Sequence, residues 1–368
     1  MAKFFFSMSG EGRGHATRVR AVIEQLRHAH EITVLAPGHA YKFLSPLYAD
    51  TDVRVLPIPG LLFQYNDAKK LDARRTVGAA LQYLRGFGQL RREVEALLKQ
   101  ERPDLVVADF EPSLPRAAKR LGIPFVSLTH QHFLLTYNLS SLPFYLRAHA
   151  SYMRGVVGAY YSGQKHTIVS SFYFPPLRAG LRNVTQVGVM LRPEIRFATP
   201  TDDGYIVAYL RQFAGKNVLD GLMAIGRPVR VYGLGERPAQ GNLTFHAISE
   251  EKFIADLISC SALVATSGNQ LVGEALFLGK PCFVMPEARN YEQYMNAHFL
   301  QQSGAGAWAE LEKVRPEELR NFVERLDQYA VRVDRKRLDG LPATVQVLER
   351  MLPQPRRATT RRLAPVGA

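Results

Sequence analysis

Short β-rich runs alternate with helical patterns along this chain, and the alternation occurs in two successive arrays. In the first array, strands are predicted over residues 3–8, 32–36, 53–58, 105–108, 124–128 and 167–170. In the second array, strands are predicted over residues 205–210, 229–232, 243–246, 263–266 and 282–285. Strands that alternate with helices form parallel sheets covered on both faces. The pattern therefore predicts an α/β fold of two doubly wound parallel-sheet domains that face a central cleft.

The length and one interruption of the pattern place the domain boundary. The 368 residues suit two domains of ordinary size. The pattern pauses over residues 172–184 and restarts after Arg192-Pro193. We therefore expect an N-terminal domain over 1–192 and a C-terminal domain over 193–352. The Pro- and Arg-rich residues 353–368 are expected to form a basic, disordered tail.

Basic residues are concentrated in the first half of the chain. Residues 1–194 hold 25 basic and 14 acidic residues, and residues 69–92 hold seven basic residues against Asp72 alone. No Asp or Glu occurs between Pro112 and Pro193, where nine Lys or Arg occur. The bias indicates an anionic partner, either an acidic acceptor or a membrane surface, unless it reflects solubility or genome composition. Because the chain has no zinc finger, RNP-like motif or basic heptad, we expect no nucleic-acid partner.

The compartment and the relation to membranes follow from composition. Two cysteines, Cys260 and Cys282, exclude a disulfide scaffold and give no paired-cysteine zinc motif. No apolar run approaches the ~18 residues of a membrane-spanning helix. Glu11 and Arg13 occur too early for a signal-peptide core, so we expect a cytoplasmic protein, or one peripheral at the inner face of the cell membrane. Residues 142–161 have apolar and aromatic side chains at helical spacing, which fits a core helix or an interfacial membrane helix.

A glycine-rich turn follows the first predicted strand and opens the first helix. It consists of Gly10-Glu11-Gly12-Arg13-Gly14-His15. Gly12 and Gly14 let the backbone approach an anion, to which the helix start presents N–H groups, with Arg13 and Arg18 as further cationic contacts. The glycine spacing differs from the dinucleotide fingerprint, and strand two ends without an acidic residue to bind a ribose. His15 could take a proton from a substrate hydroxyl, or cap the helix or touch a phosphate.

Two carboxylates and two histidines follow the fourth and fifth strands. Asp109 and Glu111 end strand four, and His130 and His132 follow strand five. Because the carboxyl ends of parallel strands meet at one edge, these side chains should face the same crevice as His15. A carboxylate beside His15 would fix its tautomer and raise its basicity. Alternatively, Asp109 caps the helix that follows Pro112.

The most specific motif begins at Thr266 and runs through the second array. A Ser267-Gly268-Asn269 turn ends a strand and starts a helix, a site suited to a diphosphate. Glu274 lies inside that helix and could accept hydrogen bonds from a ribose diol. Near the start of the next helix, amide and carboxylate groups are placed to bind sugar hydroxyls, at Glu292, Gln293 and Asn296.

These residues resemble a known group of enzymes. The stretch SGNQLVGEALFLGKPCFVMPEARNYEQYMNAHFLQQSGAG is similar to the donor-binding motif of UDP-sugar-dependent GT-B glycosyltransferases, particularly the MurG-like group. GEGRGHATR resembles the N-terminal glycine-rich loop of that group, and the similarity extends to about Ala309. The resemblance implies two Rossmann-like domains, the first for the acceptor and the second for the nucleotide-sugar.

The resemblance also implies roles for individual positions. It implies diphosphate contacts at Ser267, Gly268 and Asn269, ribose at Glu274, sugar hydroxyls at Glu292 and Gln293, and base contacts near Ile248, with His15 as the base. The glycine-rich donor loop of the second domain corresponds to residues 232–235, in a shorter form. Asp50-Thr51-Asp52 fits a metal-binding DxD pattern but precedes a strand, so we treat it as chance. We expect no metal and no cofactor besides the UDP-sugar co-substrate.

The predicted activity is transfer of a sugar from a UDP-sugar to an acceptor hydroxyl, inverting and metal-independent. His15, oriented by Asp109 or Glu111, would take the acceptor proton, and the start of the helix at Ser267 would stabilise the departing diphosphate. The acidic-residue gap favours a lipid-linked or anionic acceptor. The alternatives are a UDP-sugar 2-epimerase of the same architecture and a non-catalytic nucleotide-sugar-binding protein.

Overall fold

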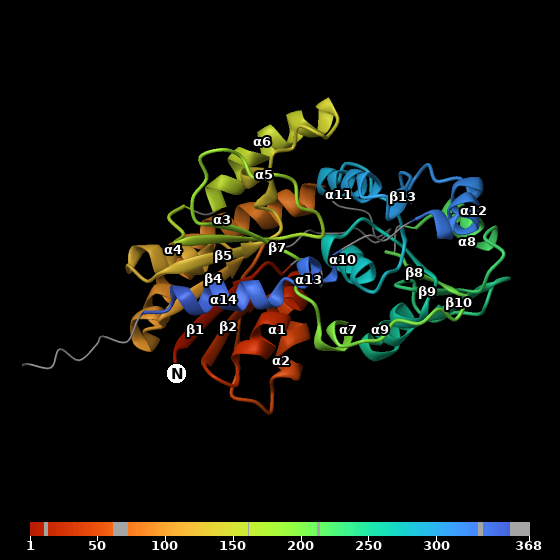
Figure 1. The fold of residues 1–368 in the computed structure, drawn as a ribbon. Coiled ribbons are helices and arrows are strands. Elements are labelled where there is room, and N and C mark those ends of the chain that lie inside the picture. Colours follow the sequence, from red (N-terminus) through yellow and green to blue (C-terminus); the bar gives the residue numbers. More distant parts are fainter. Residues whose placement is uncertain (11–13, 62–72, 161, 212–213, 330–333, 354–368) are drawn as a thin grey trace, which may run out of the picture.

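Two α/β halves, each built on a parallel sheet, make up the molecule (Figure 1). The structure is a computed structural model and describes residues 1–10, 14–61, 73–160, 162–211, 214–329 and 334–353. The elements of the first half are β1 (Lys3–Met8), α1 (Gly14–Leu26), β2 (Glu31–Pro37), α2 (Gly38–Leu47), β3 (Arg54–Ile58), α3 (Ala73–Glu101), β4 (Leu105–Asp109), α4 (Ser113–Arg120), β5 (Phe125–Thr129), α5 (Phe133–Thr136), α6 (Phe144–Tyr160), β6 (His166–Ser170) and β7 (Val184–Val187).

The first sheet has seven strands in the order β3-β2-β1-β4-β5-β6-β7, and every neighbouring pair is parallel. Phe4, Phe5 and Phe6 of β1 are fully buried, as expected for a central strand covered on both faces. Helices α1 and α2 cover one face of the sheet, and α3 and α4 cover the other. The register pairs Met8 with Asp109, so the end of β4 lies beside the loop that opens α1.

The second sheet has six strands in the order β10-β9-β8-β11-β12-β13, again all parallel. Its strand β8 lies between β9 and β11. The elements after β7 are α7 (Pro193–Arg196), β8 (Ile206–Tyr209), α8 (Lys216–Met223), β9 (Val229–Tyr232), β10 (Leu243–His246), α9 (Glu250–Ser259), β11 (Ala262–Ala265), α10 (Asn269–Phe277), β12 (Cys282–Val284), α11 (Tyr291–Gln302), β13 (Gly306–Trp308), α12 (Pro316–Glu324), the 3₁₀ turn Leu326–Gln328, α13 (Arg335–Leu338) and α14 (Leu341–Met351).

The predicted fold class of two doubly wound parallel sheets is confirmed. Every strand predicted from the sequence is present, and the structure adds β7 and β13, each at the edge of a sheet. The two halves face each other, and α1 contacts α10 while α6 contacts α11. The carboxyl end of β6 lies close to the start of α10, where Asn269 donates to the carbonyl of Ser170.

The chain crosses between the halves twice. After the second sheet, α14 returns to the first half and packs on α1 and β7 (Figure 1). The two crossings touch where Gly340 N–H donates to the carbonyl of Val189, at 3.0 Å. Gly188 and Gly340 lie so close to the facing backbone that a Cβ at either position would collide with it. The boundaries at 192 and 352 stay a prediction, and residues 354–368 of the predicted tail lie outside the described residues.

Helices α3 and α6 are only partly packed on the core. Leu90, Val94 and Leu98 of α3 are buried, whereas the apolar residues of its first turns are exposed. Leu146 and Val157 of α6 contribute to the core, so the core-helix interpretation holds for one face of that helix. None of the helices that the structure describes combines the length and the apolar character needed to cross a bilayer.

Candidate active site

His15 lies at the beginning of α1, beside the end of β4. Its Nδ1 is 3.0 Å from Oδ1 of Asp109, and the other carboxylate oxygen accepts a hydrogen bond from Arg18 at 2.7 Å. Burial opposes ionisation of Asp109, but Arg18 and His15 nevertheless hold the pKa of this carboxyl below its ordinary value. A carboxylate facing Nδ1 fixes the tautomer of the ring and leaves Nε2 on the opposite side. The structure therefore brings together the predicted histidine and one of its two predicted carboxylate partners.

Glu111 has a different place from Asp109. Its carboxylate accepts hydrogen bonds from the backbone N–H groups of Ser113 and Leu114, at 2.6 and 3.1 Å, at the start of α4. Burial raises the pKa of Glu111. Phe110 between the two carboxylates has a φ of +57°, and this left-handed residue bends the chain so that Asp109 and Glu111 diverge. Asp109 thus contacts His15, while the helix-capping contact expected for Asp109 is made by Glu111.

The two histidines after β5 are both buried. His130 Nδ1 lies 2.9 Å from the carbonyl of Ser170, and its Nε2 lies 3.2 Å from Oδ1 of Asn296 in the other half. His132 Nδ1 lies 2.6 Å from the hydroxyl of Ser127. Burial lowers the pKa of both rings, that of His132 to about 4. His132 is therefore neutral near pH 7, and His130 joins the two halves.

The turn before α10 closes against the first half. Ser267 is fully buried, and within the described part of the chain its hydroxyl has no hydrogen-bond partner. Gly268 precedes the helix, and a Cβ there would meet nothing within 4 Å. Asn269 accepts from the N–H of Phe172 and donates to the carbonyl of Ser170, both at 3.2 Å. Of the three predicted diphosphate residues, Ser267 thus has a hydroxyl without a partner among the described residues, and Gly268 has open space beside it. The side chain of Asn269 is already bound to the first half.

Glu274, the predicted ribose ligand, is almost fully buried on α10. Arg192, from the linker that leaves the first half, donates to both of its carboxylate oxygens, at 3.0 and 2.7 Å. Gln270 adds a third hydrogen bond to Glu274 at 3.0 Å, and Arg192 also reaches Glu250 at 3.2 Å. A ribose hydroxyl could bind Glu274 only by sharing or displacing the contacts made by Arg192.

The predicted sugar-binding residues all lie on α11 but differ in how deeply they are buried. Glu292, at the first turn, has a partly exposed side chain, which accepts from Gln131 at 3.4 Å. Gln293 is bound to Glu287, accepting from its N–H at 2.8 Å and donating to its carboxylate at 3.2 Å. Asn296 is fully buried; its Oδ1 accepts from Tyr173 at 2.9 Å, and its amide donates to the carbonyl of Ser267. Glu292 is thus the partly exposed member of the three, whereas Gln293 and Asn296 are buried.

The remaining predicted positions are the glycines of the two loops, Arg13 and Ile248. Gly14 starts α1, and a Cβ there would meet nothing within 4 Å, whereas Gly12 and Arg13 lie outside the described residues. Ile248, predicted to contact the base, is exposed after β10. Gly233, in the predicted donor loop, lies so close to the carbonyl of Leu210 that a side chain would collide with it. This packing accounts for the glycine without any role in anion binding.

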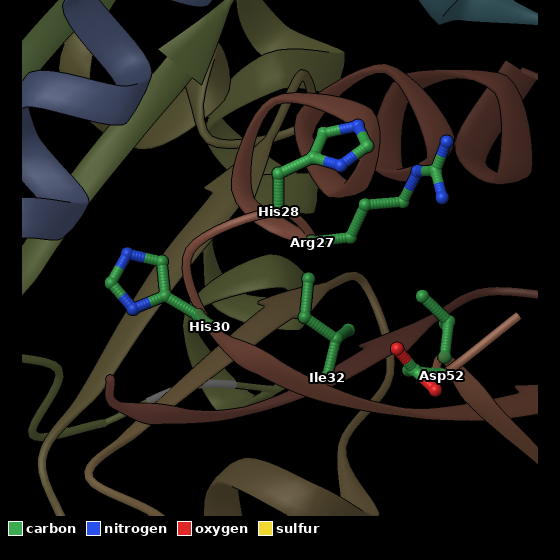
Figure 2. Close-up of a pocket in the computed structure, with 6 residues that line it drawn as sticks. Arg27, His28, His30, Ile32 and Asp52 are labelled. Carbon is green, nitrogen blue, oxygen red and sulfur yellow. The ribbon is translucent and has the colours of Figure 1, made fainter.

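A hollow lies at the amino ends of strands in the first sheet, opposite the edge where His15 lies. Asp52, the last residue of the Asp50-Thr51-Asp52 triplet, is one of its lining residues. Figure 2 shows the hollow, lined by Arg27, His28, His30, Ile32, Asp52 and Val53. These residues come from the end of α1 and the amino ends of β2 and β3. The triplet therefore lies away from His15 and α10. Within the described ranges, no group of three or more His, Cys, Asp and Glu side chains could hold a metal ion.

Sequence reasoning did not identify three side chains of the site. Arg192, Tyr173 and Glu287 each bind a predicted residue, namely Glu274, Asn296 and Gln293. Arg211, in the loop after β8, extends the last contact by donating to Glu287 at 3.2 Å. The pause in the strand pattern before Arg192 was a signal for a linker, but nothing in the spacing indicated which acidic residue Arg192 would bind.

Comparisons with known proteins give the class of this fold and site. The solved glycotransferase of kitacinnamycin matches with a TM-score of 0.66 at 17% identity, over 96% of this chain and 99% of that chain. Arabidopsis thaliana UGT89C1, complexed with UDP-L-rhamnose, matches with 0.62 at 12% identity, over 95% and 92%. The glycosyltransferase VinC, in complex with dTDP, matches with 0.60 at 16% identity, over 95% and 99%. A comparison with the curated proteins finds no match.

Two facing parallel-sheet domains of this arrangement define the GT-B fold, as predicted. A match to a family model makes the protein a glycosyltransferase by class. The family model described as glycosyl transferase family 1 matches residues 2–327, and the chain belongs to this family. The resemblance to the MurG-like group within this fold stays a prediction.

Proposed function

We propose that the protein transfers a sugar from a UDP-sugar to an acceptor hydroxyl with inversion of configuration, without a metal. The observation that carries this proposal is the His15–Asp109 contact at the start of α1, on the side of the first half that faces α10. His15 presents Nε2 as a base, and Asp109 stabilises the ring when it becomes charged. UGT89C1, a protein of the same fold, was solved with UDP-L-rhamnose, which supports a UDP-sugar as donor.

In this mechanism one bond forms as another breaks. The acceptor oxygen attacks the anomeric carbon while its proton passes to Nε2 of His15. The bond from that carbon to the diphosphate oxygen breaks, and UDP leaves with the bonding electrons. The N–H groups at the start of α10, beside Ser267 and Gly268, would stabilise the charge on the leaving diphosphate. Glu292 and Gln293 would bind the hydroxyl groups of the sugar.

The binding of the donor requires a rearrangement of the contacts described above. Asn269 is bound to the first half and Glu274 to Arg192, so the two halves must separate before a diphosphate and a ribose can reach α10. Hinge-bending enzymes close over their substrates in this way. Arg192 would then be available as a cation for the diphosphate.

The acceptor and the place of action are part of the same proposal. A lipid-linked or anionic acceptor is favoured by nine Lys or Arg and no acidic residue between Pro112 and Pro193. Cys260 and Cys282 are unpaired and buried, which suits a cytoplasmic protein, and a lipid-linked acceptor would hold it at the inner face of the membrane.

Donor choice and chemistry can be tested together. Thermal shift with UDP-hexoses and dTDP-hexoses should single out a UDP-sugar, because a ligand of the native state raises the melting temperature. NMR of the product made from that donor should show the inverted anomer. Retention would contradict a single displacement, and a UDP-sugar epimer formed without acceptor would assign the protein as a 2-epimerase. Binding without donor hydrolysis or transfer would assign a nucleotide-sugar-binding protein.

A further inference from the structure

The first turns of α3 carry a stripe of apolar side chains that no part of the described structure covers. Val77, Leu81 and Leu84 are 58%, 50% and 65% exposed. Side chains three and four positions apart are neighbours on a helix surface, so these three lie on one face of α3. The apolar residues farther along α3 are buried against the sheet. An ordered apolar stripe in solvent indicates a docking surface rather than the scattered exposure of single residues.

Helix α6 has a second exposed apolar face. Phe144 and Tyr152 are strongly exposed, and Tyr145 and Val156 are also exposed. The opposite face of α6 packs into the core, so the exposed face is held in place by the fold. Figure 1 shows α6 projecting from the first half of the molecule. Aromatic rings with one polar atom are suited to an interface between apolar material and water.

The surroundings of both stripes are basic. Residues 73–92 of α3 contain five arginines and no acidic residue, and α6 contains Arg147 and Arg154 and no acidic residue. Helix α4, which packs against α3, adds Arg116 and Lys119, whereas its Arg120 and Arg91 of α3 form ion pairs with Glu95. Long basic side chains can lay their apolar stems along a surface and keep their charges at the level of anionic groups.

One arginine of α4 contacts both helices. The guanidinium group of Arg116 lies 5.2 Å from the ring centre of Phe87 on α3 and donates to the carbonyl of Ala159 on α6, at 2.9 Å. The two helices are therefore connected through α4, at the middle of α3 and the end of α6. We call the following exposed apolar residues the docking face: Val77, Leu81, Leu84, Phe144, Tyr152 and Val156.

We propose that the docking face binds the surface of an anionic lipid bilayer, with its apolar side chains among the upper acyl chains and the neighbouring arginines at the phosphates. Charge complementarity argues for this partner, because a bilayer of anionic lipids offers phosphate groups directly above an apolar layer. The inference goes beyond the sugar-transfer reaction and does not depend on it. It concerns binding at the surface and no insertion across the bilayer.

Vesicle flotation of the full chain tests the proposal. The probes are vesicles of phosphatidylcholine alone and vesicles in which about a third of the lipid is phosphatidylglycerol, at ~100 mM salt. The protein should float with the anionic vesicles and remain at the bottom with the neutral ones, and ~500 mM salt should reduce flotation because it screens surface charges. Equal flotation with both kinds of vesicle, or none with either, would overturn the proposal.

Variants distinguish the docking face from general basic character. The double variant Leu81→Gln/Leu84→Gln should bind anionic vesicles about tenfold more weakly or worse, since it removes two apolar side chains from the bilayer. Arg74→Gln/Arg85→Gln should lose about fivefold per arginine. Matched controls are Phe197→Gln, another strongly exposed apolar residue, and Arg325→Gln in the second half, which should both float like the native protein.

Two results would reject the assignment even if flotation occurs. If the α3 variants float as well as the native protein, another surface binds lipid. If sedimentation shows that the native chain dimerises and Leu81→Gln/Leu84→Gln does not, the docking face is covered by a second copy. Unchanged circular dichroism and melting temperature should show that the variants fold, because the substituted side chains are exposed.

Discussion

Arg192 binds both carboxylate oxygens of Glu274 and thereby ties the linker after the first sheet to helix α10 of the second. The pair is buried, and Arg192 reaches a second carboxylate, that of Glu250, which also accepts a hydrogen bond from Arg20 on α1. A buried charge that loses its partner costs more than the pair contributes. This ion-pair network therefore holds the two halves together at the position predicted for the ribose.

Breaking the pair should destabilise the protein. Glu274→Gln is expected to lower the free energy of unfolding by about 3 kcal/mol, because Arg192 then keeps only the more exposed Glu250 as an anionic partner. Urea unfolding measures this change. Arg192→Met alone should cost a similar amount, and the double variant should cost much less than the sum of the two. Strict additivity would show that the two side chains do not stabilise each other.

Replacement of His15 should remove catalysis and leave the donor site intact. His15→Gln is expected to lower kcat by about 10²- to 10⁴-fold, because a general base is lost, with little change in the affinity for the donor. Asp109→Asn should also lower kcat, since it removes the charge that faces Nδ1. The measurement is the rate of UDP release with acceptor present.

A matched control is His28→Gln, which alters an exposed histidine just after the end of α1, whereas His15 lies at its start. It should retain native activity. Native activity in His15→Gln would show that another group takes the acceptor proton.

The stability of the protein should fall as the solution becomes acidic below pH 6.5. Burial lowers the pKa of His132 to about 4, whereas an unfolded chain protonates histidine at about 6.5. Between these values the unfolded state binds more protons at this site than the native state, so the free energy of unfolding decreases as the pH falls. The contribution of His132 totals about 3 kcal/mol and is complete near pH 4. Urea midpoints at pH 7, 6, 5 and 4 give the slope.

His132→Gln should have a shallower slope over the same interval. This variant keeps a polar side chain facing Ser127 and removes the titrating ring. If its slope equals that of the native protein, the acid sensitivity comes from other groups.

Helix α10 packs closely against the segment around Val189 that joins the two halves. We therefore expect that Gly273 cannot be replaced by a larger residue without loss of stability. A Cβ on Gly273 would collide with the side chain of the fully buried Val189, so Gly273→Ala should destabilise the protein although alanine favours helix. Thermal unfolding would detect this. Gly78→Ala, in an exposed turn of α3 with open space around the glycine, should instead stabilise by about 0.5–1 kcal/mol.

A second substitution provides a check on the cause. Val189→Ala in the Gly273→Ala background should recover part of the lost stability, because it removes the methyl groups that the new Cβ meets. No recovery would indicate that the loss has another origin.

The sequence predicted the central strands of both sheets because they are continuous apolar runs. It did not predict β7 and β13, which lie at the sheet edges, are only partly buried, and are four and three residues long. Apolar residues recur at helical spacing along α3, from Val77 to Leu98. Which half of that helix packs on the sheet depends on where the sheet ends, and local spacing contains no information on that.

The candidate site was predictable to the extent that it depends on topology. The end of β4 and the start of α1 had to meet at one sheet edge, and Asp109 lies beside His15 as expected. The divergence of Glu111 depends on a single left-handed residue, Phe110, which no common sequence rule assigns. The partners of Glu274 and Asn296 come from the other half of the chain and depend on how the two halves pack. The sugar, nucleotide and diphosphate roles of these residues stay predictions.

The return of α14 limits how this chain can be divided. The helix that covers part of the first sheet is encoded after the entire second sheet. A fragment that stops at residue 192 would expose the apolar side chains of α1 that Leu341 and Leu348 now cover. A fragment that starts at residue 193 would contain α14 without the sheet and helix on which it packs. Expression of the halves as consecutive pieces should therefore give aggregating material, whereas a fusion of residues 334–353 to the first piece should restore its solubility.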